Sequence, residues 1–336
     1  MLRRLLFASL LCCVSGYIYS QDIHFSQFFN APLQVNPAMT GLFPGDVRFG
    51  GNYRSQWQSV PVPYTTFSGY YDQKFYLPIL NNSLIGGGLI FNYDRAGDAN
   101  LSWTQLGVNV NYIQQIADEH YLAGGFKLMA GQRALDPNLL NFGDQFNGDI
   151  FDASQNSQEA LTKSAVGYVD LGAGVAWYFQ REDTRTYAQT GIGFSHVNQP
   201  RVSFFGDETV RLNMLFTLHQ NAVIQLSDQV DLATNIMCQL QGPYFEAVGM
   251  IGGRYHLDTK TGEPLGIHLG LGYRIGDAFF PYLGVEYLNW RAGLSYDINN
   301  SPFIAATNRR GGPEFSLSYI IAKVKPPDTF KSCPIF

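Results

Sequence analysis

Alternation of apolar and polar residues runs through most of the chain. In LGVNVNY, residues 106–112, every second residue is apolar, and those between are Gly or Asn. The stretches DLGAGVAWYF (170–179) and LGIHLGLGYRIG (265–276) repeat the pattern. A period of two is typical of β-strands, and a helical period of 3.6 does not fit these segments.

The pattern and the turn residues between its segments predict about fourteen strands. They are expected at 46–56, 64–76, 83–95, 102–116, 120–134, 164–180, 186–198, 211–225, 229–241, 244–257, 265–277, 279–288, 290–298 and 312–321. Short connections such as ADEH, REDTR and LSDQ alternate with long ones at 136–162, 199–210 and 299–311. An even strand number and alternating loop lengths are typical of bacterial outer-membrane barrels.

A soluble β-sandwich would also alternate, so the choice between the two rests on other features. The predicted strands are about ten residues or longer, above the usual five or six of globular proteins. Aromatic residues make up 15% of the chain and charged residues only 15%, and apolar rows end in Tyr, Trp or Phe. No run of eighteen apolar residues follows the first twenty. We therefore predict an all-β transmembrane outer-membrane barrel of about fourteen antiparallel strands, closed because an open edge in lipid leaves backbone groups unpaired.

The first twenty residues predict export. Arg3 and Arg4 precede an apolar stretch of about ten residues, as in a signal peptide, and cleavage is expected near Ser20. A lipoprotein signal through Cys12 or Cys13 is a less favoured alternative. Removal of residues 1–20 lowers the net charge from −5 to −7, which argues against a nucleic-acid partner.

Four regions follow from this interpretation. They are the signal peptide 1–20, an N-terminal segment 21–45 that is a plug or periplasmic, the barrel 46–321 and a periplasmic C-terminal tail 322–336. In the second region Pro37 favours an extended Asn36, Asn36 suits an Asx-turn and Gly41 can take a positive φ. This predicts a rigid turn seated at a barrel mouth. A mere leader peptide remains an open alternative.

The N-terminal stretch resembles a known family. FSQFFNAPLQVNPAMTGLFPGDVRFGGNYRSQW, residues 25–57, is similar to the N-terminal signature of the PorP/SprF family of the type IX secretion system of Bacteroidota. The matching residues are Asn36, Pro37, Ala38, Gly41, Tyr53, Arg54, Gln56 and Trp57.

The resemblance extends through the chain. LDPNLLNFGDQFNG, which contains Asp144, resembles the long loop of the family. GGPEFSLSYI, with Gly311, Gly312 and Glu314, resembles its closing strand, and CPIF, with Cys333 and Pro334, resembles its tail. One departure is Ile335, where a basic residue is expected.

The resemblance implies an outer-membrane barrel without catalytic residues or cofactors. It also implies a protein that is needed to secrete, or to retain at the cell surface, particular large substrates with a type B C-terminal domain, gliding adhesins among them. Periplasmic and outer-membrane components of the secretion and gliding machinery are implied as further partners, with outer-membrane lipid around the barrel. The matching residues are then candidates for partner binding. From the residues themselves, Arg54 is expected in the lumen, where it can pair with an acid or carbonyl of the N-terminal segment; a purely stabilising Arg54 and Trp57 are the alternative.

Other chemistry is weakly indicated. The six histidines show no metal-ligand spacing, and His268 is expected on the lumen face beside Arg274. Asp144, Asp149 and Asp152 could bind Ca²⁺, but a solvated loop is the favoured interpretation. No disulfide is expected between Cys238 and Cys333. A channel for a small or hydrophobic solute is the main alternative function, and a barrel phospholipase with paired Ser and His is a third.

Overall fold

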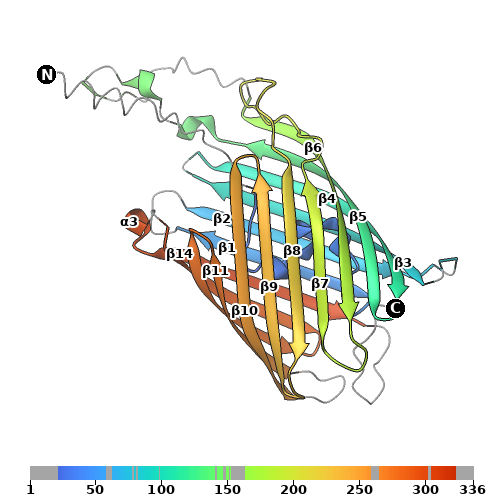
Figure 1. Ribbon diagram of the computed structural model, residues 1–336. Helices are drawn as coiled ribbons and strands as arrows, with labels where there is room; N and C mark the ends of the chain where they lie inside the picture. Colours follow the sequence, from blue (N-terminus) through green and yellow to red (C-terminus); the bar gives the residue numbers. More distant parts are fainter. Residues whose placement is uncertain are drawn as a thin grey trace, which may run out of the picture.

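A closed antiparallel barrel forms most of the protein (Figure 1). The computed structural model describes residues 22–57, 63–77, 79–80, 82–97, 99–140, 142–146, 149–150, 152, 163–258, 265–301 and 304–322. Within these ranges every strand pairs with its neighbours in sequence, and β1 closes the barrel against β14. The strands are β1 (Val47–Gln56), β2 (Tyr64–Phe75), β3 (Ser83–Ala96), β4 (Leu101–Ala117), β5 (His120–Ala134), β6 (Ala165–Gln180), β7 (Tyr187–Ser195), β8 (Leu215–Gln225), β9 (Val230–Gln241), β10 (Tyr244–Asp258), β11 (Leu265–Arg274), β12 (Ala278–Tyr287), β13 (Trp290–Asn299) and β14 (Arg310–Ile321).

The predicted fold class is confirmed, and most strand limits agree within a few residues. The largest difference from the prediction lies between β7 and β8. Strands were expected at 186–198 and 211–225, but β7 ends at Ser195 and β8 begins only at Leu215. His196 adopts a positive φ of 56° and Pro200 has no N–H, so the ladder stops there. The intervening residues instead form a small bridge between Arg201 and Arg211.

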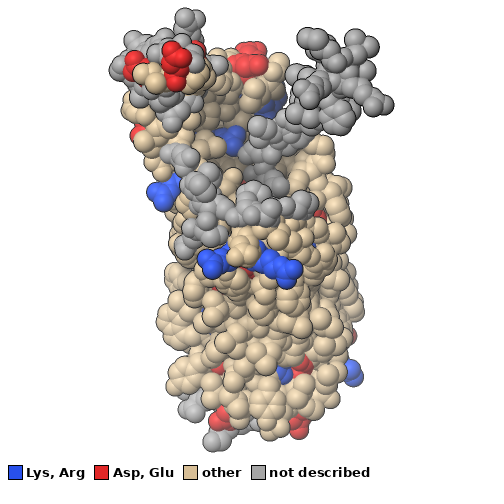
Figure 2. All heavy atoms as spheres, turned by 90° about the vertical axis from the view of Figure 1, so that its left-hand side faces the viewer, with Lys and Arg blue, Asp and Glu red and all other residues tan. Residues whose placement is uncertain are grey.

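Side chains alternate between lipid and lumen as the sequence pattern requires. On β4, Val108 and Val110 are 45% and 56% exposed on the outside, whereas Asn109 and Asn111 are buried inside. Figure 2 shows a broad surface with few charged side chains between a band of basic residues at mid-height and the lower end. No helix in the described ranges is long and apolar enough to span a membrane.

The two ends of the barrel differ. One end, called here the long-loop end, carries the connections 135–164, 196–214 and 300–309, the last with the short helix α3 (Ile304–Thr307). The opposite, short-turn end carries connections such as 118–119 and 226–229. Aromatic side chains gather near the short-turn end, where the ring centroids of Trp290 and Tyr319 are 4.6 Å apart. Such pairs suit the boundary between lipid and water.

Residues 22–46 run through the lumen and are called here the plug (Figure 1, blue). The plug contains three short helical turns, η1 (Phe28–Asn30), α2 (Pro32–Val35) and η2 (Pro37–Met39). It begins at the long-loop end, where the Asp22 amide donates to Gln241, and ends at the short-turn end, where the Asp46 amide donates to the carbonyl of Ile321. The protein core therefore lies between the plug and the barrel wall, as in the buried cluster of Ala38, Met39, Leu42, Leu84, Ile113, Tyr121, Ala123, Ala176 and Tyr178.

Candidate functional site: the plug and its anchors

The turn at Asn36 lies deep in the lumen. Asn36 is extended (φ −157°, ψ 125°), and its Oδ1 accepts a hydrogen bond of 2.9 Å from the Ala38 amide. Its Nδ2 donates to the carbonyl of Val175 on β6, at 3.1 Å. Gly41 takes the positive φ, 74°, expected of it. The local geometry is as predicted, but its place at a barrel mouth is wrong, because the turn is fully enclosed by the strands.

Inward-facing glycines on the strands leave room for this turn. A Cβ at Gly125 on β5 would collide with the backbone of Pro37 and Ala38. A Cβ at Gly174 on β6 would collide with the amide of Asn36. The plug backbone thus packs directly on the backbone of the wall, which only glycine permits.

Arg54 joins the plug to the wall at the long-loop end. Its Nη1 donates to the carbonyl of His24 at 2.8 Å, the kind of contact expected from the sequence. Its Nη2 forms an ion pair of 2.6 Å with Asp297 on β13. Both side chains are nearly inaccessible to solvent. A buried charge of this kind needs a partner, because desolvation is otherwise costly.

Glu314, opposite Arg54 on β14, completes this anchor. Its two carboxylate oxygens accept from the backbone amides of Ser26 and Gln27, each at 2.8 Å. The Ser26 hydroxyl donates to Asp297 at 2.7 Å, and Arg274 on β11 contributes a second guanidinium. We call Arg54, Arg274, Asp297 and Glu314 the anchor cluster. Its charges are balanced across β1, β11, β13 and β14 and by two amides of the plug.

His196 and Asp22 make a second contact at the long-loop end. His196 Nε2 is 2.9 Å from Asp22, and Nδ1 is 3.0 Å from Asp170. Burial alone would lower the pKa of His196, but the attraction of Asp22 and the hydrogen bonds with Asp170 and Asp22 outweigh it and raise the pKa to about 9. Burial would raise the pKa of Asp22, yet the charge of His196 holds it below its usual value. At neutral pH this is a charged pair.

The short-turn end holds the other end of the plug. Arg48 on β1 donates to both oxygens of Asp72 on β2, at 2.9 and 2.7 Å, and Asp72 accepts from the Gly41 amide at 2.8 Å. The guanidinium of Arg48 lies 4.3 Å from the ring centroid of Phe43, and the Lys74 ammonium lies 5.3 Å from it. Phe43 is thus held between two cations.

The other predicted residues of the first and last strands meet at the seam between β1 and β14. Tyr53 faces outward and is 41% exposed, while Gln56 faces the lumen and is buried. The Trp57 amide donates to the carbonyl of Gly311 at 2.7 Å. A Cβ at Gly312 would collide with the backbone of Ser55. Close approach of β1 thus requires Gly312, whereas a Cβ at Gly311 would collide with Asp297 of β13.

The predicted loop residue Asp144 is not brought to this site. Asp144 lies in a turn, η4 (Gly143–Gln145), of the long loop and is exposed, as are Asp149 and Asp152. Among the described residues, no group of three or more His, Cys, Asp or Glu is placed to hold a metal ion. Cys238 is partly buried on the outward face of β9. Cys333, Pro334 and the signal peptide lie outside the described residues.

Several residues of the site were not predicted from the sequence: Asp22, Gln27, Asp72, His196 and Asp297. Asp297 is one of the alternate residues of β13 that face the lumen, so the sequence pattern could have shown a charged side chain inside the barrel. Its partner was not, because Arg54 lies 243 residues away in sequence.

A closed barrel with its own N-terminal segment packed inside defines a plugged outer-membrane β-barrel. Solved structures support this class. A monoaromatic hydrocarbon channel, the TodX deltaS2S3 mutant, matches with a TM-score of 0.51 at 12% identity, over 86% of this chain and 94% of that chain. The toluene transporter TodX of Pseudomonas putida matches with a TM-score of 0.51 at 14% identity, over 86% and 93%. A FadL homologue of Pseudomonas aeruginosa matches with a TM-score of 0.50 at 12% identity, over 90% and 95%. At these identities the likeness shows the fold alone.

The family is shown by sequence. The family model for the type IX secretion system membrane protein PorP/SprF matches residues 18–319, which is most of the chain. The chain therefore belongs to the PorP/SprF family of type IX secretion system membrane proteins, as the resemblance of residues 25–57 indicated. A search of curated proteins found no match.

Proposed function

We propose that this barrel is a non-enzymatic accessory of type IX secretion that holds a secreted protein at the outer surface of the outer membrane. The main support for this proposal is the plug that fills the lumen. Buried ion pairs and hydrogen bonds hold it at both ends, and the glycines of the wall fit its backbone. A lumen filled in this way favours a scaffold over a conduit, so recognition falls to the exposed loops.

The long-loop end offers an ordered surface for that recognition. Trp103 and Tyr168, from β4 and β6, pack with Val202 and Leu212 of the connection between β7 and β8. The Lys163 amide, at the end of the β5–β6 connection, donates to the carbonyl of Phe204. The last residues of the β5–β6 connection are therefore bonded to the β7–β8 connection, which packs on the barrel rim.

Apolar side chains project from these connections into solvent. Phe146, Ile150 and Phe205 are each more than half exposed, and Val210 is close to that. Exposed aromatic and aliphatic residues on a fixed scaffold are typical of protein-binding surfaces. We propose that the loops 136–162, 199–210 and 299–311 bind the type B C-terminal domain of a secreted substrate, such as a gliding adhesin.

The orientation follows from loop length. Short turns face the periplasm and long loops face outside in outer-membrane barrels. The short-turn end, with the C-terminal tail that follows β14, would then meet the periplasmic secretion and gliding machinery. The proposal places the barrel in the outer membrane of a bacterium of the Bacteroidota, after removal of the signal peptide near Ser20.

Native-membrane pull-downs with two matched variants test the proposal. Phe205→Asp should reduce recovery of the secreted substrate about tenfold, as expected for loss of one central aromatic contact. Ile79→Asp, at an 88% exposed residue of the short-turn end, should not change it. Equal recovery with both variants, or a barrel that is folded yet recovered alone, would contradict substrate binding and favour the solute channel.

A further inference from the structure

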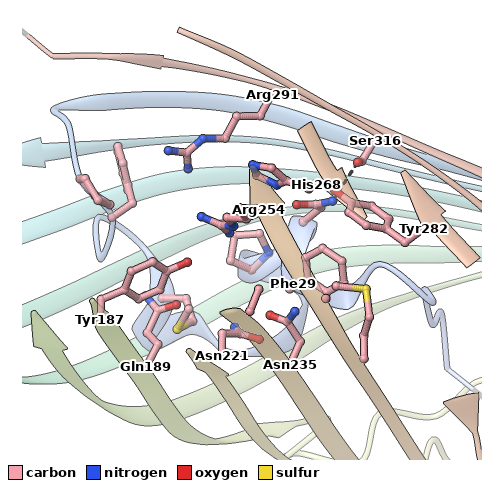
Figure 3. A pocket seen from close by; sticks show the side chains of 18 of the residues that line it. Phe29, Tyr187, Gln189, Asn221, Asn235, Arg254, His268, Tyr282, Arg291 and Ser316 are labelled. Atoms are coloured by element: carbon pink, nitrogen blue, oxygen red, sulfur yellow. Dashed lines mark hydrogen bonds between the residues drawn. The ribbon is translucent and has the colours of Figure 1, made fainter. Parts of the chain in front are cut away.

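A cavity of about 120 Å³ lies between the plug and the wall at the short-turn end (Figure 3). Phe29 of the plug and Tyr282 of β12 line it on one side, and Tyr187 of β7 lies opposite. Met250 and Tyr282 also belong to an apolar cluster with Phe28, Val35, Met237, Val248 and Phe280. This cluster separates the cavity from the anchor cluster of the long-loop end.

Three basic side chains from neighbouring strands point into this cavity. They are Arg254 of β10, His268 of β11 and Arg291 of β13 (Figure 3). Arg254 and His268 are directly opposite each other in the ladder. Two groups that can both carry positive charge are unfavourable at such a position unless an anion lies between or beside them.

The acid nearest to Arg254 along the ladder is already engaged. Asp231 of β9 is the partner of Arg254 in the register. Its carboxylate instead accepts from Arg185, at 2.8 to 3.0 Å, and contacts His256 at 2.7 Å. Among the described residues, Arg254 has neither an ion pair nor a hydrogen bond, and its Nε is buried. A partly buried guanidinium thus faces the cavity without a direct contact to a carboxylate of the described residues.

Glu286 of β12 is the acid on the other side, and it is shared. Arg291 donates to its Oε1 at 2.9 Å, through Nε and Nη2. His268 lies 3.6 Å from its other oxygen. One carboxylate therefore contacts Arg291 and His268 directly, and its charge reaches Arg254 only over a longer distance.

Small residues form part of the lining beside these groups. Gly252 of β10 and Ala233 of β9 both border the cavity. Asn221 and Asn235 point toward the cavity from the opposite wall, and Oδ1 of Asn221 has no hydrogen-bond partner in the described part of the chain. The cavity thus combines a guanidinium that has no hydrogen bond in the described part of the chain with polar and small lining residues.

We infer that this cavity binds an oxyanion, a carboxylate or phosphate group, with Arg254 as its principal ligand. A guanidinium recognises either group through paired N–H donors, Arg291 of β13 adds a second positive charge, and His268 of β11 adds a ring nitrogen. Tyr187, Asn221 and Asn235 provide hydrogen-bonding groups on the facing side. The site is independent of the long-loop surface, so it gives the barrel a second binding function at its short-turn end.

Calorimetric titration of the purified full-length protein in detergent tests the inference. The probes are inorganic phosphate and the blocked dipeptide acetyl-Glu-Phe-amide, each at constant ionic strength. Saturable binding is expected, and binding of one probe only identifies which oxyanion source the site accepts. Arg254→Gln should weaken it about tenfold or more, the loss of one charged hydrogen bond. Arg310→Gln, at an exposed arginine of the long-loop end, should not change it.

Glu286→Gln should change the affinity for the probe in the opposite direction. It removes the carboxylate that competes for Arg291 and His268, so affinity should rise several-fold. The absence of saturable binding with both probes, or equal affinity of the wild type and a folded Arg254→Gln variant, would overturn the inference. If Arg254→Gln does not fold, an unchanged or lower affinity of Glu286→Gln overturns it.

Discussion

At the scale of single residues, the site consists of buried polar groups whose partners come from distant strands. Arg54 contacts His24 and Asp297, and Glu314 accepts the amides of Ser26 and Gln27. Each of these polar groups pairs with another, because a polar group buried without a partner in a water-poor interior would cost free energy. The residues shared with the family motif therefore have a clear structural task inside the barrel.

Replacement of Arg54 tests the anchor cluster. Arg54→Ala leaves Asp297 buried without its closest ion-pair partner, and we expect a loss of about 3–5 kcal/mol in the free energy of unfolding. The exposed Arg310→Ala is the matched control and should change stability by less than about 0.5 kcal/mol. Urea unfolding followed on a heat-modifiability gel measures both. Equal stability of the two variants would show that the cluster does not hold the plug.

Two adjacent glycines test the packing of the plug. A Cβ at Gly125 meets the backbone of Pro37 and Ala38, whereas a Cβ at Gly124 meets nothing within 4 Å. Gly125→Ala should lower the unfolding free energy by about 1–3 kcal/mol, as overpacking does. Gly124→Ala, on the lipid side of β5, should be neutral. Similar effects of both substitutions would argue against a plug seated at this position.

At the scale of elements, the strands could be predicted and the plug path could not. Alternation fixes which residues of β4 face lipid, so strand limits and the lumen face of Arg54 follow from the sequence. The position of the plug depends on contacts such as Ser26 with Glu314, 288 residues apart, which no local pattern encodes. The break after β7 depended on Pro200 and a left-handed His196, which alternation alone does not reveal.

The start of the plug should respond to pH. The pKa of His196, raised to about 9 from 6.5, means that its contribution to stability is complete below pH 6.5 and is lost as pH rises through about 9. The lowered pKa of Asp22 means that its contribution is present above pH 3.8 and is lost as pH falls through the lowered value. The pair is therefore intact between these limits.

Hydrogen exchange of the peptide from Asp22 to Gln27 measures this response. After correction for intrinsic rates, protection should fall as pH rises through about 9. In His196→Gln the peptide should be less protected at pH 7 and show no further step at pH 9. A wild-type profile without that step would contradict a charged pair at this position.

At the scale of the whole molecule, a barrel whose lumen is filled by the plug suits a protein that holds a partner. The loop connecting β5 and β6 lies outside the plug and the strand ladders, so its removal should leave the barrel intact. Deletion of residues 138–160 should therefore preserve heat-modifiability and release the secreted substrate into the medium. A folded deletion variant that keeps the substrate at the cell surface would assign binding to another part of the protein.

A plug that closes the lumen leaves the barrel to act by recognition and not by solute passage. Conductance of the purified full-length protein in planar lipid bilayers distinguishes the two. No steady open-channel steps are expected at neutral pH, where both the Arg54–Asp297 pair and the Asp22–His196 pair hold the plug. Reproducible open-channel steps from folded wild-type protein would contradict a closed lumen and favour a solute channel.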